Sequence, residues 1–328
     1  MQTAGKNFSV TLLNRALSLA AVVVGCFSFA PQASSADMVR VAAGNRGNWE
    51  QSVTELGKRK GIFAKHGLDL DILYTQGSGE TQQAVISGSV DIGLGLGFGS
   101  IMGAFAKGAP VRIISNAMRG GFDVYWYVPV ASPIKSFKDA EGKTVGYSTN
   151  GSSTNIMALG LISEAKVNAK IVATGSPSST FAQTMSGQID IGWSSPPFGV
   201  DAIEQGKIRV VARGSDVPSF RTQTLRVHVT NKGFLDSKPD VVNRFMKAYR
   251  ETLDWMYAND EALGMYSEWL SIPISIASRT RSEFFPKDNQ LTTMISDSDL
   301  AMKDAVTYKF LAAPLTAAQL SELIKIPK

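Results

Sequence analysis

The feature that most restricts the fold of this chain is a heptapeptide that occurs twice. Residues 87–93 read SGSVDIG and residues 186–192 read SGQIDIG, so Gly88 and Gly187 lie 99 residues apart. Glycine after a helical stretch permits a left-handed helix C-cap, and the apolar residues that follow are typical of a buried strand. The same turn in the same setting predicts two similar structural units. We expect the heptapeptides to shape this turn rather than contact a ligand, with Asp91 and Asp190 bonded to its backbone.

Each heptapeptide marks the turn from the second helix into the third strand of a βαβαβ unit. In the first unit we predict strands at residues 39–43, 68–74 and 90–94, with helices at 49–65 and 80–87. In the second unit we predict strands at residues 143–147, 170–174 and 189–193, with helices at about 153–165 and 179–186. This alternation predicts an α/β fold of two doubly wound lobes, in which a ligand binds at the carboxyl ends of the strands.

The loops that follow these strands are therefore the predicted ligand site. They are residues 45–49, 76–79 and 95–99 in the first unit and residues 148–155 and 194–198 in the second. Their many Gly, Ser, Thr and Asn residues let a ligand approach backbone N–H groups at helix N-termini, where an anion is favoured. The candidate ligand-binding residues are Arg46, Asn48, Trp49, Ser78, Phe98, Arg119, Asn150, Gly151, Ser152, Ser153, Trp193 and Ser195.

Several of these candidates have a second interpretation. Residues 151–155 open a predicted helix, so Ser152 or Ser153 also fits as a simple N-cap, a role that is compatible with ligand binding. Trp49 and Phe98 fit the wall of a pocket or the hydrophobic core. Arg46 and Arg119 have planar guanidinium groups suited to a carboxylate or sulfonate, but arginine is also common on surfaces.

Residues suited to catalysis or metal binding are few. His66 and His228 are distant in sequence and outside the loops, so neither a zinc site nor a histidine triad is predicted. Gly95, Gly97 and Gly99 follow a strand but lack the spacing of a dinucleotide-binding motif. Glu50 and Glu80 are the acids nearest these loops. We predict no catalytic residues, no metal and no cofactor.

The first 36 residues predict a secretory signal peptide. Lys6 and Arg15 precede an apolar run at residues 16–30, and residues 34–36 are the small Ser-Ser-Ala that a signal peptidase requires. An alternative is a lipoprotein anchored at Cys26, the single cysteine. Cleavage after Ala36 leaves no cysteine and lowers the net charge from +5 to +3. That excess suits an anionic ligand or is ordinary surface charge, and no basic stripe suited to nucleic acid is present.

Four further segments add to the heptapeptides and the signal peptide. They are KGIFAKHGLDL at residues 60–70, SPIKSFKDAEGKTVG at 132–146, Pro196-Pro197, and KPDVV at 238–242. Together they resemble the periplasmic solute-binding proteins of ABC importers, in the nitrate-, taurine- and sulfonate-binding family that also includes thiamine-precursor synthases. The resemblance implies a type II periplasmic binding fold, with the ligand cleft between two lobes.

The resemblance also implies a domain plan. After a signal peptide at residues 1–36, lobe 1 comprises residues 37–126 and 228–328, and lobe 2 comprises residues 127–227. Two crossings, near 125–131 and 225–230, form the hinge. A long helix from 238 to about 258 then joins lobe 1, with Ser237 and Asp240 resembling a capping box.

The function that this resemblance implies is capture of a small anionic organic solute by an extracytoplasmic binding subunit. Its expected partners are the solute and a permease/ATPase complex at the inner membrane, with no nucleic acid, and the protein is expected to be a periplasmic monomer. One alternative is a periplasmic sensor subunit. Another is an enzyme like the pyrimidine-precursor synthases, which use a histidine and a cysteine-rich motif that the cleft loops of this chain lack. Effector domains of transcription regulators share the fold, but here a secretory signal replaces their DNA-binding helices.

Overall fold

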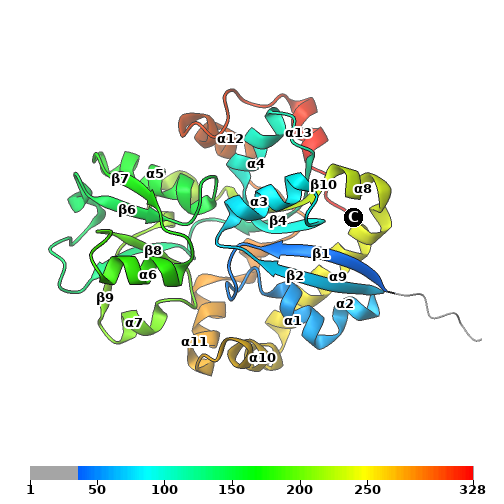
Figure 1. The fold of residues 1–328 in the computed structure, drawn as a ribbon, viewed down its shortest axis with the longest axis horizontal. Coiled ribbons are helices and arrows are strands. Elements are labelled where there is room, and N and C mark those ends of the chain that lie inside the picture. The colour runs from blue at the N-terminus through cyan, green and yellow to red at the C-terminus, as the bar shows by residue number, and fades with distance from the viewer. Residues whose placement is uncertain (1–35, 328) are drawn as a thin grey trace, which may run out of the picture. The chain divides into compact units, whose positions relative to one another are not determined.

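The computed structural model describes residues 36–327, in which the strands form three sheets (Figure 1). The first sheet has the order β2 (Leu68–Tyr74), β1 (Asp37–Ala43), β3 (Ile92–Gly97), β10 (Thr224–Asn231) and β4 (Val111–Arg119). The other two contain β8 (Gly192–Ser194), β5 (Tyr125–Pro129) and β9 (Ile208–Arg213), and β6 (Thr144–Tyr147) with β7 (Lys170–Ala173). We call the first sheet with its helices the first lobe, and the other two sheets with theirs the second lobe.

The helices fill the connections between these strands. Those before the second lobe are α1 (Val53–Lys60), α2 (Ile62–Lys65), α3 (Ser78–Ser87) and α4 (Phe98–Ala106). Those of the second lobe are α5 (Ser153–Ala165), α6 (Pro177–Met185) and α7 (Val200–Glu204). After β10 come α8 (Lys232–Ser237), α9 (Pro239–Ala258), α10 (Asp260–Leu270), α11 (Ile274–Arg279), α12 (Ser298–Thr307) and α13 (Ala317–Leu323). Within residues 36–327, none of them combines the length and apolarity needed to cross a membrane. The signal peptide predicted at residues 1–36 lies outside the described residues except for Ala36, and Cys26 lies outside them too.

The predicted α/β fold class is confirmed, but of the three sheets only that of β6 and β7 is wholly parallel. β1 pairs in parallel with β2 and β3, whereas β10 runs antiparallel to both β3 and β4. In the second lobe β5 is likewise antiparallel to β8 and β9. Both antiparallel strands follow a segment that crosses from the other lobe. Because no βαβ connection precedes them, the parallel orientation that such a connection favours does not apply.

The first sheet is covered on both faces, as its sequence pattern requires. Along β1, Val39, Val41 and Ala43 pack into a core shared with α1, α9 and α10. The alternate residue Ala42 packs into a second core with residues of α3, α4 and α12. Because successive side chains of a strand point to opposite faces, a run with few polar residues predicts this double burial. A separate core fills the second lobe around Trp126, Val145 and Leu161.

Two local predictions about helices need correction. The single helix predicted at 49–65 is two, because Gly61 adopts φ 77°, a left-handed conformation that ends α1 before α2 begins. The capping box predicted at Ser237 and Asp240 is absent. Lys238 is the N-cap of α9, and the Ser237 hydroxyl instead donates to backbone carbonyls of α8.

The repeated heptapeptide forms the same turn in both lobes. Gly88 ends α3 with φ 75° and Gly187 follows α6 with φ 76°, so the predicted left-handed glycines are confirmed. The aspartates bind the neighbouring strand rather than their own turn. Asp91 Oδ2 accepts from the Arg40 backbone N–H at 2.9 Å, and Asp190 Oδ2 accepts from the Thr144 N–H at 2.9 Å. Each aspartate therefore attaches the segment just before the third strand to the first strand of its lobe.

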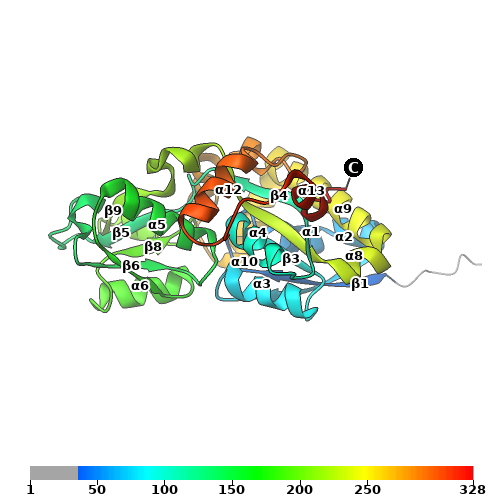
Figure 2. The ribbon, with the colours of Figure 1, turned by 90° about the horizontal axis from the view of Figure 1, so that it is seen from above.

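The two lobes are joined by connections at residues 120–124 and 214–223. Tyr125 already belongs to β5 of the second lobe, and Thr224 belongs to β10 of the first. The predicted boundaries at 126 and 227 thus fall inside strands rather than in the connecting segments. A further contact comes from the segment after α12, where Tyr308 and Phe310 pack against the core of the second lobe. Figure 2 shows α12 beside α4 of the first lobe.

Candidate functional site

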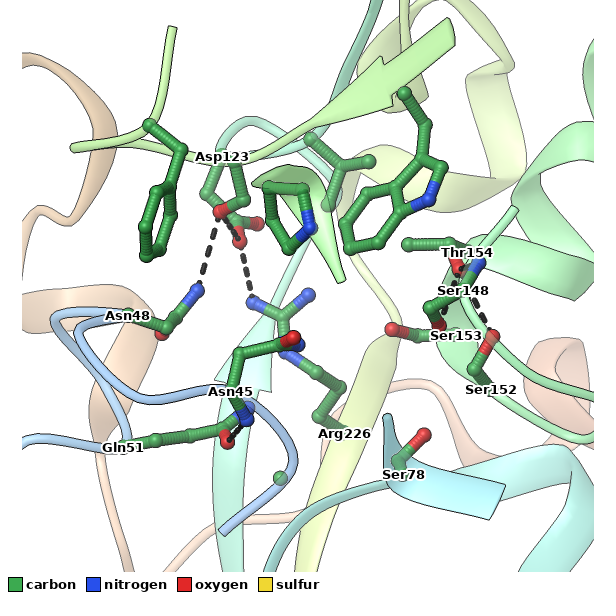
Figure 3. Close-up of a pocket in the computed structure, with 16 residues that line it drawn as sticks. Asn45, Asn48, Gln51, Ser78, Asp123, Ser148, Ser152, Ser153, Thr154 and Arg226 are labelled. Carbon is green, nitrogen blue, oxygen red and sulfur yellow. Dashed lines mark hydrogen bonds and ion pairs between the residues drawn. The ribbon is translucent and has the colours of Figure 1, made fainter. Parts of the chain in front are cut away.

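A small polar pocket lies where loops of the two lobes face each other (Figure 3). Every loop predicted for the ligand site contributes to it. The lining residues are Asn45, Asn48, Gln51, Ser78, Gly95, Asp123, Val124, Ser148, Ser152, Ser153, Thr154, Pro177, Trp193, Ser195, Phe198 and Arg226. The cavity volume is about 30 Å³, which is room for on the order of one or two water molecules. The lobes are therefore packed closely around this pocket.

Direct hydrogen bonds between the lobes hold them together around the pocket. The Asn48 side-chain amide donates to Ser195 Oγ at 3.1 Å, and the Gly79 N–H donates to Thr149 Oγ1 at 3.0 Å. Farther out, Arg279 of α11 pairs with Glu204 of α7 at 2.8 Å. The structure is consequently a closed arrangement of the two lobes.

One wall of the pocket is the N-terminus of α5. Ser152 is its N-cap, with Oγ accepting from the Asn155 N–H at 3.1 Å. The next two residues, Ser153 and Thr154, occupy the first turn, where backbone N–H groups have no partner within the helix. The Ser153 hydroxyl makes no hydrogen bond to another described residue, and Figure 3 shows it on the pocket side of the loop. This wall presents donors and the positive end of a helix dipole.

The opposite part of the pocket holds Arg226, which lies on β10 and joins two buried acids. Its Nη2 donates to Asp123 Oδ2 at 2.7 Å, and its Nε donates to Glu50 Oε2 at 2.7 Å. Both carboxylates have fully buried side chains, and Arg226 is 4% exposed. The remaining nitrogen, Nη1, makes no hydrogen bond to any described residue, so Arg226 keeps donor capacity for the pocket.

The charges of this cluster are set by burial and by mutual attraction. Burial alone would lower the pKa of Arg226, but the charges of Asp123 and Glu50 raise it above its usual value, so the guanidinium stays protonated. Burial raises the pKa of Glu50, partly countered by Arg226. The positive charge of Arg226 is therefore held at the floor of the pocket between two buried carboxyl groups.

His228 lies behind this cluster and is not an acid–base group. Its Nδ1 accepts from the Gly95 N–H at 3.2 Å, and its ring packs edge-on against Tyr249 at 4.8 Å between centroids. Burial, with a further contribution from Arg226, lowers its pKa to about 3. The ring is therefore neutral at physiological pH and supports the backbone of the Gly95 loop.

The structure brings six of the twelve candidate residues together in this pocket. They are Asn48, Ser78, Ser152, Ser153, Trp193 and Ser195. Trp193 is oriented by a hydrogen bond from its Nε1 to Thr174 Oγ1 at 3.1 Å. Their roles as ligand contacts stay predictions.

The other six candidates lie elsewhere, each for an identifiable reason. Trp49 is in the core of the first lobe, bonded through Nε1 to the Tyr257 hydroxyl, and Phe98 is buried against α4 and α12 residues. Arg46 stacks on Trp269 at 5.1 Å from the ring centroid, and Arg119 donates to Asn289 Oδ1. Asn150 and Gly151 line a separate groove of about 830 Å³ on the outer side of the α5 loop.

The two charged residues of the pocket were not among the candidates predicted from the sequence. Asp123 lies in the first connection between the lobes, and Arg226 lies on β10 just after the second, in a segment predicted to be a hinge rather than part of the site. The signal was the string LRVHVT at residues 225–230, where a charged residue and a histidine interrupt an apolar run. Charge within a strand that is buried on both faces indicates a buried partner.

A larger cavity of about 550 Å³ adjoins the pocket and shares Asn45, Pro177 and Phe198 with it. Its other walls include Arg46, Tyr74 and apolar residues of the segment around 270–276. The inner pocket thus has an outer chamber large enough for a small organic molecule. Within residues 36–327, no group of three or more His, Cys, Asp or Glu side chains is arranged to hold a metal ion.

Comparison with known proteins finds relatives of two kinds. The family model described as "NMT1/THI5 like" matches residues 21–262. The 4-amino-5-hydroxymethyl-2-methylpyrimidine phosphate synthase THI12 of Saccharomyces cerevisiae is 23% identical over 219 residues, which are 62% of each chain. A putative binding protein of Brucella abortus is 26% identical over 239 residues, covering 71% of this chain and 72% of that protein. The chain therefore spans less than two thirds of the length of the yeast relative.

Among solved structures, the alkanesulfonate-binding protein SsuA of Xanthomonas axonopodis pv. citri, bound to MOPS, is similar with a TM-score of 0.72. The match covers 90% of this chain and 100% of that protein at 15% identity, which shows the fold alone. Other structural neighbours are periplasmic sulfonate-binding and nitrate-binding proteins. The chain belongs to the NMT1/THI5-like family and has the fold of the periplasmic solute-binding proteins.

Proposed function

We propose that this chain is the extracytoplasmic solute-binding subunit of an ABC importer. It captures a small anionic organic solute of the sulfonate, carboxylate or nitrate type by lobe closure, and delivers it to a permease. The observation that carries the proposal is a polar pocket with walls from both lobes, lined by the N-terminus of α5 on one side and Arg226 on the other. A ligand that contacts both lobes stabilises the closed state by its differential affinity.

The donors of the pocket support an acidic group on the solute. Four donors of pocket-lining residues have no partner among the described residues. They are the backbone N–H groups of Ser153 and Thr154, the Ser153 hydroxyl, and Arg226 Nη1. Backbone donors at a helix N-terminus together with a guanidinium suit carboxylate or sulfonate oxygens. The acidic end of the solute is placed at this wall.

The enclosing hydrogen bonds support capture by closure. The inner pocket has the volume of one or two waters, so a solute of several heavy atoms enters only when the lobes separate at residues 120–124 and 214–223. The outer chamber of about 550 Å³ offers the route by which it reaches the pocket. On this proposal the protein acts in the periplasm as a monomer, after removal of the signal peptide predicted at residues 1–36.

A ligand screen tests the proposed function. Mature protein is mixed with sulfonates, carboxylates, nitrate and pyrimidines, and both the melting temperature and the chemical integrity of each compound are measured. We expect at least one compound to raise the melting temperature and to remain unchanged. Turnover of a compound would favour an enzyme like the yeast relative, and no shift with any compound would contradict solute capture.

Removing the Ser153 hydroxyl is expected to weaken binding without destabilising the free protein. Ser153→Ala takes away a pocket donor that makes no other bond to the described residues, so we expect a severalfold loss of affinity for the compound found in the screen, measured by calorimetry. Ser152→Ala is the matched variant. Because Ser152 is the N-cap of α5, its loss should lower the stability of the free protein by about 1 kcal/mol. Equal affinity of Ser153→Ala and wild type would remove Ser153 from the proposed anion site.

Obstructing the contact between the lobes should impair closure. A Cβ added at Gly79 would lie 2.3 Å from the Asn150 carbonyl oxygen of the second lobe, although the backbone of Gly79 is not strained. We expect Gly79→Ala to lower ligand affinity at least tenfold and to increase the radius of gyration of the liganded protein in solution scattering. Gly264→Ala is the control, because a Cβ there meets nothing within 4 Å. Unchanged affinity and unchanged scattering for Gly79→Ala would show that binding does not require this closed contact.

A further inference from the structure

The segment that follows α12 is a loop of the first lobe that reaches into the second lobe. We call residues 308–310 the strap. Before it, Ala301 and Ala305 of α12 pack in a core of the first lobe, and after it Leu311 and Leu315 pack in the same core. The family model ends at residue 262, so the strap lies outside the segment that this model matches. The strap is thus fixed in the first lobe on both of its sides.

The side chains of the strap join the cores of the two lobes. Tyr308 packs against the core that fills the second lobe. Phe310 packs against that core and also against the first-lobe core that contains residues of α4 and α12. Among the described residues, Phe310 is the only apolar side chain that packs against cores of both lobes. A rotation of the lobes about residues 120–124 and 214–223 therefore separates Phe310 from one of its two cores.

The backbone gives the strap a defined shape. The N–H groups of Phe310 and Leu311 both donate to the Ala305 carbonyl, at 2.8 and 3.0 Å. Between them and α12, Lys309 adopts φ 64°, a left-handed conformation that residues other than glycine seldom adopt. Gly103 of α4 leaves room for this turn, because a Cβ there would overlap the Phe310 carbonyl oxygen. The strap is consequently a turn held tightly against α4.

A buried hydrogen bond fixes the base of the strap at the connections between the lobes. Asp304 Oδ2, in the last turn of α12, accepts from Gln223 Nε2 at 2.6 Å. Gln223 is the last residue of the second connection, and its carbonyl accepts from the Gly120 N–H of the first connection at 3.0 Å. The strap therefore begins where the two connections are bonded to each other, and it ends in the core of the second lobe.

We propose that the strap is a conformational device that holds the lobes together from outside the two connections. Closed lobes bury Phe310 against two cores and separated lobes leave it with one, so the strap favours the closed form before any solute binds. This inference goes beyond the proposed function, because it concerns the protein without solute. It also bears on affinity, since the apparent affinity for a solute that binds the closed form falls in proportion to the closed fraction.

Spin labels on the two lobes test the strap without any solute. Leu73 of β2 and Met185 of α6 are exposed residues on different lobes. The mature chain predicted to begin at residue 37 has no cysteine, so the labels attach only at Leu73→Cys and Met185→Cys. Electron–electron resonance then measures the distribution of distances between the labels.

Phe310→Ala is expected to add a population with a longer distance between the labels. The ratio of closed to open molecules should fall about 3- to 15-fold, the factor that corresponds to half-burying a phenyl ring. Phe105→Ala is the matched control, because Phe105 is also a half-buried phenylalanine but packs against the first-lobe core alone. It should leave the distances as in the wild type. The same distance distribution in Phe310→Ala and wild type would overturn the proposal.

Gly103→Ala displaces the strap without removing an apolar side chain. Alanine suits the helical backbone of α4 better than glycine, so the fold is retained while the added Cβ forces the Phe310 carbonyl away. We expect the same longer-distance population as in Phe310→Ala. Gly264→Ala, where a Cβ meets nothing within 4 Å, should match the wild type.

Unchanged distances in Gly103→Ala would show that the strap does not hold the lobes together. This variant decides the matter should Phe310→Ala fail to fold. Because no solute is present in these measurements, their outcome is independent of the ligand screen that tests the proposed function.

Discussion

Replacing Arg226 with glutamine is expected to destabilise the protein by about 3–5 kcal/mol and to abolish measurable solute binding. The substitution leaves Asp123 and Glu50, whose side chains are fully buried, with no counter-charge. It also removes the Nη1 donor that faces the pocket. Urea unfolding measures the loss of stability, and calorimetry with the solute identified in the screen measures the loss of affinity.

Two further variants separate the loss of stability from the loss of affinity. Arg226→Lys keeps the charge but not the planar fork that reaches both acids, so a smaller loss of stability and a large loss of affinity are expected. Arg226→Met combined with Glu50→Gln and Asp123→Asn removes all three charges together. Because a neutral cluster has no charge to desolvate, this variant should recover most of the stability without recovering binding. A wild-type free energy of unfolding in Arg226→Gln alone would show that the ion pairs of Arg226 do not stabilise the packing of β10 against residues 120–124.

Lowering the pH is expected to decrease the free energy of unfolding through protonation of His228 in the unfolded chain. Its pKa is lowered to about 3 in the folded state from an ordinary value of 6.5, so the unfolded chain binds one more proton between these values. The stabilising contribution is therefore present in full above about pH 6.5 and is lost as the pH falls toward 3. Between pH 6.5 and pH 4 the free energy of unfolding should fall by about 3 kcal/mol from this residue.

His228→Asn isolates that contribution. The asparagine Oδ1 can replace Nδ1 as acceptor of the Gly95 N–H, but the side chain does not titrate. The variant should lose less stability on acidification than the wild type, by about the same 3 kcal/mol, in urea unfolding series at pH 7, 6, 5 and 4. His66→Asn, which changes the histidine that pairs with Glu251 at the surface, is the control. Parallel pH curves for His228→Asn and wild type would show that His228 is not the source of the acid sensitivity.

Local sequence was enough to locate the loops of the site. A strand that ends at a Gly-, Ser- or Asn-rich loop before a helix places that loop at the carboxyl edge of the sheet, and loops such as 148–155 and 194–198 reach the pocket for this reason. Local sequence did not predict which side chains within a loop face the pocket. Asn48 and Trp49 are adjacent, yet Asn48 lines the pocket while Trp49 fills the core, because the turn directs neighbouring side chains to opposite sides.

The charged floor of the pocket could not be derived in the same way. Glu50, Asp123 and Arg226 are far apart in the chain and meet because β10 lies between β3 and β4 beside the first connection. Periodicity predicts which face of an element is buried, but not which charged group from another element will be buried with it. The arginines predicted instead, Arg46 and Arg119, are near the cleft in sequence but have partners elsewhere in the first lobe.

The sequence alone determined the α/β class, the two related units and the turn that ends each third strand. These features follow from backbone chemistry that acts over a few residues, such as the left-handed φ of Gly88 and Gly187. Tertiary structure decided which strands cross between the lobes, their antiparallel direction, and the meeting of Arg226 with two buried acids. Those features depend on contacts between residues more than 100 positions apart, whose energies come from burial and charge pairing that no local pattern encodes.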